Sequence, residues 1–294
     1  MALPTPPAAP VPQLTIAIDD ALPGVIELRA TGNINLPELR NAFRELAQTR
    51  ATHGDLRCMV LDAVRSVIDK SSYGTFEIII VLDDTAPAGL ANELRGIDPR
   101  VRVLGWDKPF NFSAKANYGA FCASGDLILF LNDDVEVISP GWLEALIALC
   151  QLPNSGMAGA MLYYPDGTIQ HAGHVHRNGA PDHVGKGDAR GSVGPGSGYV
   201  VEREVSGVTA ACALVVREAF EAVGGFSLQF PINYNDVDLS LKLAMLGYAT
   251  YWTPHAELFH YESMTRDALV LEYERAALRS RWAWKLDDLS RWPY

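Results

Sequence analysis

The hydrophobic pattern along the chain changes near residue 58. Before this point, residues 14–18 and 25–30 are two extended stretches joined by turn residues, which predicts a β-hairpin. Residues 37–48 follow with apolar side chains at helical spacing. Beyond residue 58, apolar strands alternate with amphipathic helices.

The part that begins at residue 58 has the element order of an α/β fold. Two of its strands are almost wholly apolar, which is typical of strands buried on both faces of a parallel sheet. The predicted elements are a helix over 59–69, a strand over 76–82, a helix over 88–95, a strand over 101–104, a helix over 113–123 and a strand over 126–131. This alternation predicts a doubly wound, mostly parallel sheet flanked by helices, with ligands bound beyond the carboxyl ends of the strands.

The C-terminal half has a less regular pattern. Its predicted elements are a helix over 140–149, an extended segment over 208–217, a helix over 236–246, a strand over 250–253 and a helix over 269–292. Residues 166–198 are rich in glycine and histidine and have no clear period. We expect this long stretch to be a functional lid or a mobile loop that faces an acceptor.

Composition restricts the partners. With 294 residues, 48% of them hydrophobic, the chain can form one large domain or two small ones. The formal net charge of -11 argues against nucleic acid as the main partner. A nucleotide diphosphate is also anionic, so an acidic protein that binds one needs a local positive element such as a metal ion or a helix N-terminus.

Cysteine usage and hydropathy bear on the compartment. The four cysteines lack paired C-x-x-C spacing and indicate buried free thiols in a reducing environment. No apolar run reaches the roughly 18–20 residues that cross a bilayer. The first residues have neither the basic start nor the apolar stretch of a secretory signal, so we expect a disordered leader and a cytoplasmic location.

Acidic side chains follow both apolar strands. Asp83 and Asp84 follow the first strand, and Asn132, Asp133 and Asp134 follow the second. Hard divalent cations take oxygen ligands, and Mg²⁺ or Mn²⁺ is commonly held by one or two carboxylates together with substrate phosphates. The alternative is a solvated acidic turn before the helix over 140–149. These residues alone leave both interpretations open.

Other candidate groups also have two interpretations each. Asp236 and Asp238 precede a helix, where a carboxylate acts either as an N-cap or as a general base. His260 follows a strand and is either structural or placed to reach a site. Lys115 is either a phosphate or base contact or a solvated lysine. The histidines of residues 166–198 suggest a metal site, but their irregular spacing favours an acceptor loop (His171, His174, His176 and His183).

The combination and order of several segments resembles glycosyltransferase family 2 of the GT-A fold, particularly the rhamnosyltransferase-like members that build bacterial O-antigen and related polysaccharides. The resemblance covers roughly residues 58–266. The segments that carry it are 76–85, 110–114, 129–137, 164–173, 223–226, 235–239 and 252–254, with His260 after them.

The resemblance implies an inverting transfer of a sugar from a UDP- or dTDP-linked donor to a hydroxyl of a glycan or lipid-linked acceptor, with Mn²⁺ or Mg²⁺ as cofactor. Asn132 occupies the first position of the family's D-x-D motif, which removes one charge but keeps an oxygen ligand. The implied roles are donor binding for Asp83, Asp133 and Lys115, metal binding for Asp134 and His260, catalytic base for Asp236, and an acceptor side with Asn235, Asp238 and His171.

The ends of the chain depart from the family pattern. The base-binding loop that usually precedes the helix over 59–69 is missing from its expected place. We expect a leader over 1–13, a hairpin and helix over 14–57 that form an atypical start of the domain or a separate fragment, a GT-A domain over 58–266 and a C-terminal helix over 267–294. That helix mixes arginines with tryptophans and either packs on the sheet or lies peripherally on an anionic membrane.

Two other functions compete with sugar transfer. The missing loop and Asn132 favour a noncatalytic glycan-binding or assembly module with a degenerate donor site, whereas Asp134, Asp236 and His260 oppose it. A nucleotidyltransferase would share a nucleotide-binding α/β layer. The chain lacks a glycine-rich phosphate loop near its N-terminus, which ranks that class last.

Overall fold

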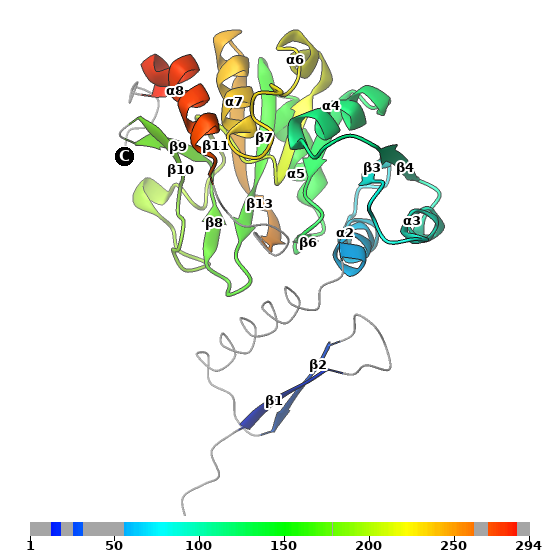
Figure 1. Ribbon diagram of the computed structural model, residues 1–294. Coiled ribbons are helices and arrows are strands. Elements are labelled where there is room, and N and C mark those ends of the chain that lie inside the picture. The colour runs from blue at the N-terminus through cyan, green and yellow to red at the C-terminus, as the bar shows by residue number, and fades with distance from the viewer. Residues whose placement is uncertain (1–12, 19–25, 32–55, 178, 262–269, 287–294) are drawn as a thin grey trace, which may run out of the picture. The chain divides into compact units, whose positions relative to one another are not determined.

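The computed structural model describes residues 13–18, 26–31, 56–177, 179–261 and 270–286 (Figure 1). The chain divides into two compact units, 1–54 and 55–294, and each is described by itself. In the first unit, β1 (Gln13–Ile18) pairs antiparallel with β2 (Ile26–Thr31), which confirms the predicted hairpin. The helix expected over 37–48 and residues 1–12 of the expected leader lie outside the described residues.

The second unit begins with the predicted alternation of helix and strand. Its first elements are α2 (Leu56–Lys70), β3 (Ile78–Asp83), α3 (Leu90–Ile97) and β4 (Val101–Trp106). The two strands run parallel, with Ile78 opposite Val101. Apolar side chains at helical spacing pack the two helices against them and form a small core. Strand β3 ends at Asp83. This residue therefore lies at the carboxyl edge of the strands, where α/β folds bind ligands.

The central sheet contains seven strands, and its main path is β11–β13–β7–β12–β5. The longer strands β5 (Leu127–Leu131), β7 (Ser155–Tyr163) and β13 (Ala249–His260) share one direction, because β12 (Cys212–Val216) is antiparallel to β5 and β7 while β13 is parallel to β7. The short strands β6 (Val135–Val137), β8 (Ile169–His171) and β11 (Arg203–Glu204) pair antiparallel at its margins. The expected α/β class of GT-A type is confirmed.

Helices cover both faces of this sheet (Figure 1). One core joins the sheet to α4 (Phe112–Cys122), α6 (Arg217–Ala222) and α7 (Asn235–Met245). The opposite core joins it to α5 (Trp142–Cys150) and α2. Strand β7 is buried at every position and sends alternate side chains into the two cores. The sheet is thus the middle layer of three.

Two segments differ from the sequence-based expectation. Strand β7 was not predicted, because its glycine and alanine residues give neither alternation nor a bulky apolar run. The stretch 166–198 was expected to be a mobile loop. It instead contains β8, β9 (His174–Arg177), β10 (Ala180–His183) and the short 3₁₀ helix η1 (Pro195–Ser197). Its histidines are packed into the fold, so the mobile-loop prediction is wrong there.

The C-terminal helix α8 (Glu272–Leu286) packs on α7 and on the segment before it (Figure 1). Leu278, Trp282 and Leu286 are buried in this contact with Phe230 and Leu241. Trp284 is exposed. The position of Trp282 therefore agrees with packing of this helix on the fold, which was the alternative to contact with a membrane. Among the described residues, no helix combines the length and the apolar character needed to span a bilayer.

Candidate functional site

The register of two strands brings Asp134 and His260 together. Residues 132–134 follow β5 directly, and β6 begins at the next residue. Strand β6 pairs antiparallel with the end of β13, with His260 opposite Val135. The Asp134 Oδ1 atom lies 3.1 Å from His260 Nε2, and the two side chains are each 9% exposed. A carboxylate oxygen and an imidazole nitrogen thus converge in a sheltered place at the sheet's carboxyl edge.

Gln170 fixes the orientation of the His260 ring. Its amide nitrogen donates to the His260 carbonyl at 3.3 Å, so its amide oxygen must face the ring. That oxygen lies 2.7 Å from His260 Nδ1, which must therefore carry a proton and donate. The lone pair of a neutral ring is then on Nε2, toward Asp134. A histidine that ligates a metal usually has its second nitrogen held in this way.

Asp236 lies in the first turn of α7, beside the end of β5. Its Oδ2 accepts from the Ala210 backbone N–H at 3.2 Å and its Oδ1 from the Val237 N–H at 2.8 Å. The next residue, Ala211, accepts a hydrogen bond from the Asn132 N–H at 3.1 Å. The segment 210–211 therefore connects the half-buried Asp236 carboxylate to the acidic turn after β5.

The structure pairs Asp83 with Lys115. The Lys115 Nζ atom, in α4, lies 2.5 Å from Asp83 Oδ2 at the end of β3, and both side chains are partly buried. Asp133 is exposed in the turn after β5. These three side chains were expected to face a donor nucleotide, and the structure places Asp83 and Asp133 at the carboxyl ends of two strands. The amine of Lys115 already has an anionic partner.

The structure places Asp238 elsewhere. It was expected on the acceptor side, but its side chain is fully buried beneath α8. Its Oδ1 accepts from the Trp282 indole N–H at 2.8 Å and lies 3.1 Å from Arg281 Nε. An acceptor cannot reach it there, so we correct that expectation. Asn235 is also buried, and its side chain donates to the Ile232 carbonyl at 3.0 Å, which holds the start of α7.

His171, the third residue expected on the acceptor side, is 1% exposed. Its Nδ1 lies 2.8 Å from His183 Nδ1, and its Nε2 accepts from the Thr209 backbone N–H at 3.2 Å. Burial is the main cause that holds the pKa of this imidazole well below its usual range, with the neighbouring His183 adding to the effect. His171 is therefore a neutral interior group and not part of an acceptor-binding surface.

Sequence reasoning missed Gln170. Its residue type gives no chemical signal, and its contact with His260 spans 90 positions. It lies beside His171 in β8, and successive side chains of a strand point to opposite faces. One short strand therefore supports both the Asp134–His260 pair and the cluster of histidines. Recognition of β8 as a strand would have indicated this alternation.

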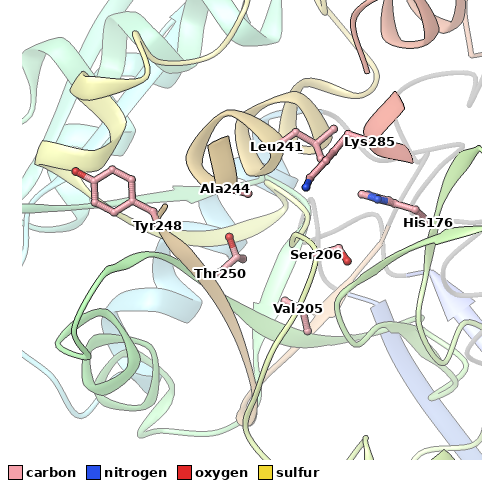
Figure 2. A pocket seen from close by; sticks show the side chains of 8 residues that line it. All are labelled: His176, Val205, Ser206, Leu241, Ala244, Tyr248, Thr250 and Lys285. Atoms are coloured by element: carbon pink, nitrogen blue, oxygen red, sulfur yellow. The ribbon is translucent and has the colours of Figure 1, made fainter. Parts of the chain in front are cut away.

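Two pockets in the described part of the chain lie away from Asp134, Asp236 and His260. Figure 2 shows one of them, lined by side chains from α7, α8 and the start of β13 and including His176, Ser206 and Lys285. Its volume of about 20 Å³ admits little more than a single water molecule. The other, about 260 Å³, lies beside Asn154 and Ala249, at the amino ends of β7 and β13. Neither is lined by Asp134, Asp236 or His260.

The comparisons with known proteins establish the class. Residues 52–224, more than half of the chain, match the sequence profile of Glycosyl transferase family 2. The chain belongs to this family, as its motifs predicted. It is a glycosyltransferase-family protein whose similar sequences include proteins of O-antigen biosynthesis and rhamnosyl transfer.

Three relatives illustrate this similarity. The uncharacterized protein y4gI of Sinorhizobium fredii is 38% identical over 77% of this chain and 26% of its own length. The O-antigen biosynthesis protein RfbC of Myxococcus xanthus is 37% identical over 70% of this chain and 17% of its own. The N-acetylglucosaminyl-diphospho-decaprenol L-rhamnosyltransferase of Mycobacterium tuberculosis is 26% identical over 57% of each chain. The chain thus spans about a quarter or less of the first two relatives.

Solved structures support the GT-A fold. GalNAc-T7 with UDP, GalNAc and Mn²⁺ superposes with a TM-score of 0.56 at 15% identity, over 69% of this chain and 41% of that one. The mannosyltransferase PcManGT of Pyrobaculum calidifontis, in complex with GDP-Man and Mn²⁺, gives 0.50 at 14% identity, over 77% of this chain and 66% of that one. At these identities the likeness concerns the fold.

Proposed function

We propose that this chain is a metal-dependent, inverting glycosyltransferase of bacterial surface polysaccharide synthesis. It would act in the cytoplasm or at the inner face of the membrane, and move a sugar from a UDP- or dTDP-linked donor to a hydroxyl of a glycan or lipid-linked acceptor. The observation that carries the proposal is the buried Asp134–His260 pair, with 3.1 Å between Oδ1 and Nε2. The names of the relatives favour rhamnose as the sugar.

The side chains at this edge suit a divalent cation. Asp134 offers a carboxylate and His260 a nitrogen lone pair, whose direction is fixed by Gln170. Asn132 lies in the same turn with its Nδ2 3.1 Å from His260 Nε2, so its side chain would have to turn to present the amide oxygen to the ion. The imidazole favours Mn²⁺ over Mg²⁺, because Mg²⁺ takes oxygen ligands almost exclusively. When bound, the cation supplies the positive charge that offsets the negative charge of a departing diphosphate.

Asp236 is the candidate general base. Each carboxylate oxygen carries two lone pairs, and each has one main-chain N–H donor, so each keeps capacity to accept the proton of an acceptor hydroxyl. The two N–H groups also fix the carboxylate's direction. A correctly placed base contributes about 10²–10⁴-fold to the rate of such a step.

Asp83 and Asp133 are proposed to contact the donor nucleotide, and Lys115 is proposed to support Asp83. Asp83 and Asp133 lie at the ends of β3 and β5, where α/β sheets bind ligands. Lys115 holds the Asp83 carboxylate at 2.5 Å and thereby limits its rotamers. Its direct contact with a phosphate would require this ion pair to open, so we assign Lys115 a positioning role.

The test is release of nucleotide diphosphate from dTDP-rhamnose or a UDP-hexose, in the presence of Mn²⁺ and a lipid-diphosphate-linked N-acetylglucosamine. We expect release and product formation by the wild type, none by Asp134→Ala, and about a 10²–10⁴-fold slower reaction by Asp236→Asn with donor binding retained. Full activity of Asp236→Asn would remove Asp236 as the base. No nucleotide binding by the wild type would favour the noncatalytic module.

A further inference from the structure

Three histidines from three short strands gather in the interior. His171 ends β8, His174 begins β9 and His183 ends β10, and the last two are direct cross-strand partners. Their ring centroids form an almost equilateral triangle, with sides of 4.8, 5.0 and 5.1 Å, and the ring planes are 76–87° apart. One ring nitrogen of each lies within 4.8 Å of the others.

We propose that His171, His174 and His183 form a second metal site, separate from the Asp134–His260 pair, that takes a divalent transition ion such as Zn²⁺. Three imidazoles are a ligand set that suits Zn²⁺, with a water molecule in the fourth position. His183 is only partly buried, which leaves room for that water. The proposal does not depend on the proposed sugar transfer.

The size of the triangle fits tetrahedral coordination. A Zn–N bond of about 2.0–2.1 Å puts a ring centroid about 3.2 Å from the ion, and two such rings at the tetrahedral angle have centroids about 5.2 Å apart. The observed sides differ from this by a few tenths of an ångström. The nitrogens of His171 and His183, 2.8 Å apart, must separate to about 3.3 Å. The ligand atoms of the three residues lie within 4.8 Å of one another, so the rings would have to rotate and shift for all three nitrogens to reach one ion.

The protonation states are also suitable. Burial lowers the pKa of His174 to about 3 and that of His171 well below its usual range, so neither imidazole has to lose a charge-bearing proton at pH 7. His174 Nδ1 has no hydrogen-bond partner in the described part of the chain, although the residue is 2% exposed. A buried imidazole with an unused nitrogen is uncommon, and a ligand would explain its retention.

The backbone before His174 permits this arrangement. Gly173 has φ +99°, a conformation that other residues rarely adopt, and a Cβ there would lie 2.8 Å from the Val205 side chain. The chain can therefore turn between β8 and β9 within two residues. As a result His171 and His174 face each other, with 5.0 Å between their ring centroids.

Metal binding by His171 would affect the backbone segment 209–210, which also contacts Asp236. His171 accepts from the Thr209 N–H through Nε2, so its own proton is on Nδ1, toward His183. Coordination through Nδ1 moves that proton to Nε2 and leaves the ring neutral. The Thr209 N–H must then turn away. Its neighbour Ala210 holds Asp236, so the ion would adjust the segment beside the proposed base.

The experiment uses the Asp134→Ala background, so that the first site does not compete. The chain is stripped with a chelator and titrated with Co²⁺, whose visible absorption reports tetrahedral nitrogen coordination, and then with Zn²⁺ as competitor. We expect about one equivalent of Co²⁺, displaced by Zn²⁺. His174→Ala and His183→Ala should each weaken binding by at least about tenfold. His176→Ala, a neighbour outside the triangle, should leave it unchanged.

Either of two results would overturn the proposal: binding of less than about a tenth of an equivalent, or equal Co²⁺ affinity in both variants and the parent. His183→Ala changes a partly exposed side chain, so it gives a decisive result even where His174→Ala fails to fold. Mn²⁺-dependent binding of UDP or dTDP to His183→Ala with Asp134 restored is measured separately. Its persistence together with the loss of Co²⁺ would establish two independent sites.

Discussion

Asp236 and Asp238 lie two residues apart in α7, and the structure predicts opposite consequences for their removal. Asp238 is fully buried, accepts from the Trp282 indole N–H at 2.8 Å and lies 3.1 Å from Arg281 Nε. Lys242 Nζ is 3.7 Å from its second oxygen. Asp236 is half-buried, and in the described part of the chain its carboxylate accepts hydrogen bonds from main-chain N–H groups. We therefore expect Asp238 to matter for stability and Asp236 for turnover.

The magnitude for Asp238→Ala follows from these contacts. Loss of a hydrogen bond to a charged group costs about 1.5–3 kcal/mol. The Arg281 side chain is 38% exposed, so its ion pair adds only about 0–1 kcal/mol. Lys242 is left buried without its anionic neighbour, and breaking such a buried pair brings the total to about 3–5 kcal/mol. For a unit of this size the melting temperature should fall by roughly 6–20 °C.

Urea unfolding followed by tryptophan fluorescence measures this loss. Asp238→Asn keeps an oxygen for the Trp282 N–H and should cost about 1–2 kcal/mol. Asp236→Ala removes a contact comparable to a helix cap and should cost about 1 kcal/mol. A double-mutant cycle with Trp282→Phe should give a coupling of about 0.5–3 kcal/mol. An ordinary substitution changes the free energy of unfolding by about 1 kcal/mol. If the value for Asp238→Ala lies within about 1 kcal/mol of the wild-type value, the role assigned to Asp238 is refuted.

Three further predictions concern other parts of the chain. Gln170→Ala should weaken Mn²⁺ affinity about 10–100-fold in calorimetry. It should also lower the free energy of unfolding by about 1–3 kcal/mol, because it leaves buried polar groups of His260 without partners. At pH 8 a thiol reagent should label Cys122 but not Cys150 or Cys212, because burial raises the pKa of Cys150 to about 12 and also raises that of Cys212; mass spectrometry of the native protein identifies the labelled sites. Gly173→Ala should destabilise the protein by about 1–3 kcal/mol in thermal unfolding, because its φ is +99°.

The parts of the fold that the sequence predicted share one property. Each has a local pattern that only one element type satisfies, such as the apolar strand that ends at Asp83 or the helical spacing of α2. Strand β7 had no such pattern, because its small side chains are buried on both faces. Strand β13 was predicted as 250–253 but extends to His260, through an irregularity in its pairing between Trp252 and Glu257.

The candidate site was predictable only in part for a similar reason. Asp134 could be placed from its position after a strand, whereas its 3.1 Å approach to His260 depends on the pairing of β6 with β13. The burial of Asp238 depends on α8, more than 40 positions away. The histidine cluster depends on the β9–β10 register. Long-range strand pairing and helix docking decided these contacts, and neither leaves a local signal in the sequence.

The most direct test of the account is titration calorimetry of UDP and dTDP with and without Mn²⁺, on the wild type and on Asp134→Ala and His260→Ala. Asp238→Asn is the matched control, because it alters a carboxylate of the same unit outside the proposed site. The account predicts binding that requires Mn²⁺, that is retained by the control and that is lost in both site variants. Metal-independent binding, or equal binding by Asp134→Ala and the wild type, would contradict it.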